Sequence, residues 1–176
     1  ANPKTPDQVD QRTKFVTVLR FLQPITEFLR TGFKKYASGM TQFNSAMSYN
    51  LNNAITGTYP NYSVDYPNAL VSRGNLAGGV NGAAASTNPA EVDLSWDDNS
   101  GSGGAQATDK ALIVILNPTK GEAVYTTAGA ARSATAETLT VPSNFTGDDV
   151  EVFLGFISED GTKVSNSSYL GSVTVA

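Results

Sequence analysis

The chain has 176 residues and a net charge of −4, with 40% hydrophobic and 16% charged residues. This composition can form a folded core and is not that of a disordered chain. The sequence contains no cysteine and no histidine, which excludes disulfides, thiolate metal sites and every His-dependent catalytic triad within the chain. No apolar run approaches the roughly 18 residues that a membrane-spanning helix needs.

The charge is distributed unevenly along the chain. Residues 1–50 carry seven Lys/Arg and three Asp/Glu, a net +4, whereas residues 51–176 carry five and thirteen, a net −8. Two parts of opposite sign can attract each other within one molecule or between molecules.

Residues 1–56 predict a helical hairpin. An amphipathic pattern follows Asp7, which we take as the N-cap, and Pro24 predicts a kink or a short break. Thr41 then predicts the cap of a second helix.

The apolar residues of the first helix cover roughly half of its circumference, more than the ~100° that a one-sided surface helix needs. We therefore expect part of this surface to pack within the chain and the rest to contact another subunit. The predicted interface residues are Phe15, Val18, Leu19, Phe21, Leu22, Ile25, Phe28, Leu29 and Phe33.

Residues 57–90 predict a Tyr/Pro-rich connector followed by a Gly/Ala-rich loop, with short strands near Ser63–Tyr66 and Leu70–Arg73. Tyr59, Tyr62 and Tyr66 are rigid aromatics that could stack on a sugar ring or a protein surface. Equally, they could pack the connector onto the following domain, which is the interpretation we favour.

Residues 91–176 predict an antiparallel β-sandwich. "VDLSW" (Val92–Trp96) alternates apolar and polar residues, and "ALIVIL" (Ala111–Leu116) is a continuous apolar run, typical of a central strand covered on both faces. Six or seven short strands without intervening helices favour an Ig-like or fibronectin-like sandwich, in which Trp96 would lie in the core. The predicted fold class is α+β, with the helical hairpin preceding the sandwich.

Charged and polar clusters give only weak site predictions. Asp97, Asn99 and Asp109 offer the oxygen ligands that calcium prefers, but no Glu closes the loop, so a solvated loop is favoured over a metal site. The basic residues of the helical segment are too sparse for a nucleic-acid partner. We predict no catalytic residue and no cofactor.

Segments spread over essentially the whole chain carry a resemblance to a known family. "FLRTGFKKYA", "ATDKALIVILNPTK" and "GFISEDGTKVSNSSYLGSV" resemble a family of unknown function from Bacteroidota bacteria. The resemblance implies no activity. Members of that family carry a further Gly-rich, apolar segment upstream of the helix, so the resemblance implies cleavage or truncation at this end.

These observations favour a non-enzymatic structural subunit that self-associates into a cell-surface or extracellular filament or lattice. The apolar helix and the opposite charges would make a head-to-tail contact between copies, so the predicted partner is a homo-oligomer or polymer. Two alternatives remain: a surface module that binds a glycan or a surface protein, and a structural protein of a phage or mobile element.

Overall fold

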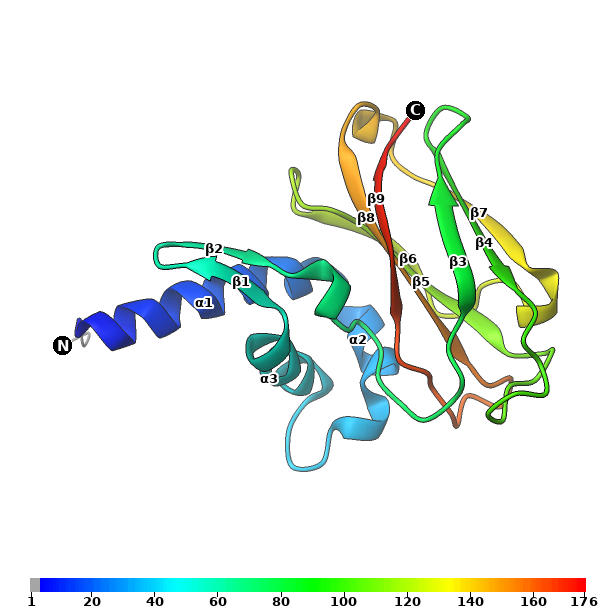
Figure 1. The fold of residues 1–176 in the computed structure, drawn as a ribbon, viewed down its shortest axis with the longest axis horizontal. Helices are drawn as coiled ribbons and strands as arrows, with labels where there is room; N and C mark the ends of the chain where they lie inside the picture. Colours follow the sequence, from blue (N-terminus) through cyan, green and yellow to red (C-terminus); the bar gives the residue numbers. More distant parts are fainter. Residues whose placement is uncertain (1–3) are drawn as a thin grey trace.

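The structure is a computed structural model that describes residues 4–176. It confirms the α+β fold class: a helical part precedes two antiparallel sheets that form a sandwich. Figure 1 shows the helices on one side of the molecule and the C terminus within the sandwich, with the N-terminal end of α1 reaching away from it. No helix in residues 4–176 is both long enough and apolar enough to cross a membrane.

The helical layer comprises residues 6–53, and its two longer helices each begin after a capping threonine. Thr5, rather than Asp7, caps the first helix: its hydroxyl accepts from the Gln8 amide while Pro6 takes the first helical position. Thr41 caps the last helix as predicted, and the break at Pro24 is a 3-10 turn. The elements are α1 (Pro6–Leu22), η1 (Gln23–Ile25), α2 (Thr26–Gly32), η2 (Lys34–Tyr36) and α3 (Gln42–Asn53).

A two-stranded hairpin beside α1 links the helical layer to the sandwich (Figure 1). The sandwich packs a three-stranded sheet, in the order β3-β4-β7, against a four-stranded sheet, in the order β6-β5-β8-β9. This arrangement is that of an Ig-like or fibronectin-like sandwich. The elements are β1 (Ile55–Thr58), β2 (Asn61–Val64), η3 (Tyr66–Asn68), β3 (Val80–Ala85), β4 (Glu91–Asp97), β5 (Lys110–Asn117), β6 (Glu122–Thr126), η4 (Arg132–Ala134), β7 (Ala136–Thr140), η5 (Ser143–Phe145), β8 (Asp149–Ile157) and β9 (Ser168–Thr174).

Two local predictions for the connector are wrong. Strand β3 lies inside the segment predicted to be a Gly/Ala-rich loop. The sequence did not predict this strand, because its small residues show no alternation of apolar and polar side chains. A Cβ on its Gly82 would lie 2.5 Å from the Leu170 side chain, so a larger residue here would require that side chain to move. Leu70–Arg73 is not a strand: Leu70 bonds instead to the Asn50 side chain, whose amide accepts from its N–H and donates to its carbonyl at 3.0 Å.

Strand β5 is buried on both faces, as its continuous apolar run predicts. Ala111, Ile113 and Ile115 contribute to the core between the sheets. Leu112, Val114 and Leu116 contribute to a second core between the four-stranded sheet and the helical layer. The period of two along a strand sends neighbouring residues to opposite faces, so one strand serves both cores.

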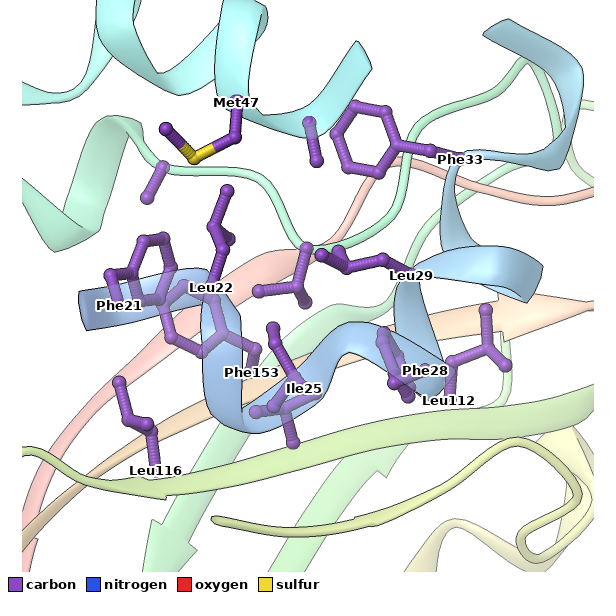
Figure 2. Packing of buried hydrophobic residues seen from close by; sticks show 14 of the residues in the cluster. Phe21, Leu22, Ile25, Phe28, Leu29, Phe33, Met47, Leu112, Leu116 and Phe153 are labelled. Carbon is purple, nitrogen blue, oxygen red and sulfur yellow. The ribbon is translucent and has the colours of Figure 1, made fainter. Parts of the chain in front are cut away.

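The second core buries most of the residues predicted to contact another subunit. Seven of them are at most 2% exposed: Val18, Phe21, Leu22, Ile25, Phe28, Leu29 and Phe33. Figure 2 shows six of these side chains, all but Val18, between the helices and the sheet, with Met47 above and Phe153 among them. The interface prediction is wrong for these seven, because the outer face of the sheet and α3 together cover most of the apolar surface of the helical segment. Leu19 is partly buried, and only Phe15, at 46%, is well exposed.

A buried arginine closes one end of the sandwich core. Arg132 is fully buried, and its guanidinium lies 4.0 Å from the centre of the Phe156 ring. Its carbonyl accepts from the Trp96 indole at 2.8 Å, and Trp96 lies in the core as predicted. The Asp109 carboxylate, 1% exposed, pairs with the guanidinium at 3.0 Å. Each charge therefore compensates the other in a place where an unpaired charge is very costly.

Two valines of α1 test the helical layer. Val18 is fully buried whereas Val16 is 37% exposed on the same helix. We expect Val18→Ala to lower the free energy of unfolding by about 2 kcal/mol through lost burial and a residual cavity. Val16→Ala should change it by at most about 0.5 kcal/mol. Urea denaturation measures both, and equal effects would contradict the packing described here.

The buried ion pair is tested by removing one partner. Arg132→Met leaves the Asp109 carboxylate buried without its counter-charge, so we expect a loss of about 3–5 kcal/mol in unfolding free energy. The matched control is Arg30→Met, because Arg30 pairs with Glu27 at the surface with 66% of its side chain exposed. Its loss should stay below about 1 kcal/mol. If Arg132→Met lowers the unfolding free energy by no more than the control does, the buried pair contributes little to stability.

Candidate functional site

Four segments meet at one end of the sandwich around two adjoining cavities. They are η2, residues 74–79, the β4–β5 loop (98–109) and the β8–β9 loop (158–167). The cavities measure about 590 and 420 Å³ and share Gly104 and Lys163 on their walls. We call the two together the loop-end groove. Connecting loops on a rigid sandwich commonly carry binding sites.

The Arg132 guanidinium fixes the segments that border the groove. Besides its bond to Asp109, it donates to the carbonyls of Ala77 and Gly78 at 2.8 and 3.0 Å and to Asn99 Oδ1 at 2.8 Å. Asn99 Nδ2 also donates to the Gly78 carbonyl at 3.1 Å. One buried cation thus ties residues 77–78 to both ends of the 98–109 loop.

Asp109 uses only one of its two carboxylate oxygens within the described chain. Oδ2 accepts from the Gln106 amide at 2.8 Å and from Arg132 Nε at 3.1 Å. Oδ1 is buried and has no hydrogen-bond partner in residues 4–176. Asp109 also borders the smaller cavity. A residue that borders the groove therefore carries a buried acceptor without a partner in the described chain.

The two cavities differ in charge. The larger is bordered by Lys35 and Lys163 and by no carboxylate, whereas the smaller is bordered by Asp109, Glu159, Asp160 and Lys163. Hydrogen bonds from the Ser158 hydroxyl and from Thr162 lower the pKa of Asp160 to about 2, so this carboxyl is ionised at any ordinary pH. The groove is therefore basic at one end and acidic at the other.

The helical layer is tied to the groove at two points. Lys34 Nζ donates to the Gly161 carbonyl in the 158–167 loop. Tyr36 borders the larger cavity, and the Arg73 guanidinium lies 4.2 Å from its ring centre and 4.9 Å from that of Tyr49. These contacts make the helical layer one wall of the groove.

The three weak metal candidates do not come together. Asn99 and Asp109 both bond to the Arg132 guanidinium, which takes the place that a cation would need. Asp97 lies apart and accepts from Asn81 Nδ2 at 2.6 Å. In the described residues no group of three or more acidic side chains is placed to hold a metal ion.

The connector tyrosines take different positions. Tyr62 donates to Asp10 and lies 5.3 Å from Lys14 Nζ, which holds β2 against α1. Tyr66 stacks on Tyr169 at 5.9 Å, and burial together with the Glu151 charge raises its pKa to about 12. These two tyrosines pack the connector. Tyr59, at the hairpin tip, is 52% exposed.

Sequence reasoning missed Arg132 and the lysines of the groove as site residues. Arg132 had one readable signal: it is the only basic residue between Lys120 and Lys163, and it stands among small residues in "AGAARSATA". A lone arginine in such a stretch suggests a specific buried partner. Nothing in the spacing of Lys35 and Lys163 indicates that they face one cavity.

Solved structures of fn3 domains match part of this chain. The fn3 domain of human collagen alpha-1(XX) chain has 14% identity and a TM-score of 0.44, with 58% of this chain and 87% of that chain covered. The chicken CNTN1 FN1–FN3 domains have 8% identity and a TM-score of 0.47, with 59% of this chain and 35% of that chain covered. Such values concern the fold alone.

Sequence comparison places the whole chain in one family. No curated protein matches this sequence. A family model described as "Family of unknown function (DUF6266)" matches residues 1–171, which covers the helical layer and nearly all of the sandwich. The chain belongs to this family of unknown function, DUF6266.

Proposed function

We propose that the protein is a non-enzymatic binding module at the cell surface or outside the cell, and that its ligand occupies the loop-end groove. The observation that carries this proposal is a concave, polar site built from four separate segments and bordered by both charges. Its cavities are within the ~300–1,000 Å³ of typical ligand sites. The ligand is a glycan or a segment of a protein.

The fixed geometry of the walls supports binding in preference to a loose surface role. Arg132 holds residues 77–78 and Asn99, and Lys34 holds the 158–167 loop. A site that is ordered before the ligand arrives loses less conformational entropy on binding. Hydrogen-bond donors and acceptors of both charges along the groove suit reversible recognition.

Blocking the groove tests the proposal. Asn75 is exposed and borders the larger cavity, so Asn75→Trp should fill part of it. Ligands found on glycan and peptide arrays should bind this variant about tenfold more weakly, a loss of about 1.4 kcal/mol. Asn144→Trp, at an exposed position of η5, is the matched control. The proposal fails if every array ligand binds both variants alike, or if no ligand binds the wild type.

Self-association into a filament or lattice is a second candidate function. The surface available for it is smaller than the sequence predicted, because seven of the nine predicted interface residues are buried within the chain. Phe15 and Val16 are 46% and 37% exposed on α1, and Phe15 borders a cavity of about 490 Å³ with Met47 and Leu51 of α3. Exposed apolar side chains beside a hollow favour contact with another copy. The opposite net charges of the two parts of the chain would add to such a contact.

Sedimentation velocity over a wide concentration range tests this second candidate. If copies associate through α1, the wild type should form species larger than a monomer, and Phe15→Ser should abolish them. Raised salt should weaken the association if the opposite charges contribute. A wild type that stays monomeric at the highest concentration contradicts self-association through this surface.

A further inference from the structure

We infer that the loop-end groove recognises a protein segment that presents a basic side chain and a carboxylate close together. This inference rests on the proposed binding function and specifies its ligand. The basic group would lie in the smaller cavity beside Glu159 and Asp160, and the carboxylate would lie in the larger one between Lys35 and Lys163.

The smaller cavity selects a cationic hydrogen-bond donor. The buried oxygen Oδ1 of Asp109 has no partner in the described chain, and a buried acceptor left unsatisfied costs about 1–3 kcal/mol. Glu159 and Asp160 border the same cavity. Asp109 is paired with Arg132, so among the described residues that line this cavity Glu159 and Asp160 carry two negative charges against the single positive charge of Lys163. Lys34 is not among the lining residues, and its ammonium bonds to the Gly161 carbonyl. An ammonium or guanidinium group would compensate the charge of the exposed carboxylates Glu159 and Asp160 and donate hydrogen bonds to them.

The larger cavity selects an anion with an apolar stem. Among the residues that the structure describes, Lys35 and Lys163 are the only charged ones that line it. Tyr36, Leu76 and Val164 line it as well, so methylene groups can be covered while a carboxylate reaches a lysine. Lys163 borders both cavities, and the two sites are therefore close enough for side chains of one short segment.

The opposite charges of the two cavities favour a protein segment over a glycan. An acidic glycan would be attracted by the lysines but repelled by Glu159 and Asp160, and a neutral glycan would leave both lysines without a partner. A segment with one basic and one acidic side chain matches both ends. Like-charge contacts are costly at a binding surface, so this pattern excludes ligands of a single sign.

Small fragments test the charge pattern on the full chain. We would titrate the ¹⁵N-labelled protein with 6-aminohexanoate, hexylamine, hexanoate and maltotetraose, and follow the amides of Gly104, Gln106 and Thr162. The fragment with both charges should shift these amides and bind about threefold to fivefold more tightly than either fragment with one charge, as expected for one extra exposed ion pair.

Two substitutions assign the ends of the groove. Lys35→Ala should reduce binding of 6-aminohexanoate to the level of hexylamine, and Glu159→Gln should reduce it to the level of hexanoate. Arg30→Ala removes an exposed cation of the same helical layer, and it should leave all affinities unchanged. Asp109 itself is left intact, because it holds the Arg132 pair.

The outcomes separate this inference from the proposed function. Shifts produced equally by hexylamine or hexanoate alone, or unaffected by Lys35→Ala and Glu159→Gln, overturn the inference. Preferential shifts with maltotetraose also overturn it, but they leave a binding function in the groove. If no fragment shifts the loop amides and no array ligand depends on Asn75, the inference and the proposed function both fail.

Discussion

The central constraint on this fold is a strand that must be covered on both faces. Strand β5 is buried at every position from Ala111 to Asn117, so the four-stranded sheet cannot leave its outer face in water. The helical layer meets that need, and its Phe and Leu side chains form the second core. Burial of this kind is the main favourable contribution to folding. The apolar N-terminal helix is thus primarily part of the fold rather than a free surface.

The sequence was sufficient for the parts of the fold that follow from side-chain period. The alternation of Val92–Trp96, the apolar run of β5 and the Thr41 cap are local signals, and the structure confirms all three. Strand β3 was not predicted, because its alanine and glycine residues show no alternation of apolar and polar side chains. The full extent to which the N-terminal helix is buried within the chain was also not predicted. The helical period gives the width of an apolar face, but not how many elements of the same chain will cover it.

The candidate site could be predicted far less well, for a physical reason. Lys35, Asp109 and Lys163 lie on three segments that are distant in sequence, and the topology alone brings them to one groove. The sequence analysis named Asn99 and Asp109 as candidate metal ligands, but the Asn99 amide oxygen and the Asp109 carboxylate accept hydrogen bonds from Arg132. A sequence shows that a charge exists, whereas only the fold shows which opposite charge compensates it.

Arg132 links the stability of the sandwich to the shape of the groove. The same guanidinium packs on Phe156 in the core and bonds to the carbonyls of Ala77 and Gly78, which directly follow lining residues 74–76 of the groove. Loops usually gain adaptability by being loosely attached, but these loops are anchored to a buried charge pair. Under the proposed binding function, ligand specificity can therefore change at exposed positions such as Lys35 and Lys163 without disturbing the core. Changes at Arg132 or Asp109 would alter folding and binding together, which separates the frame of the site from its recognition surface.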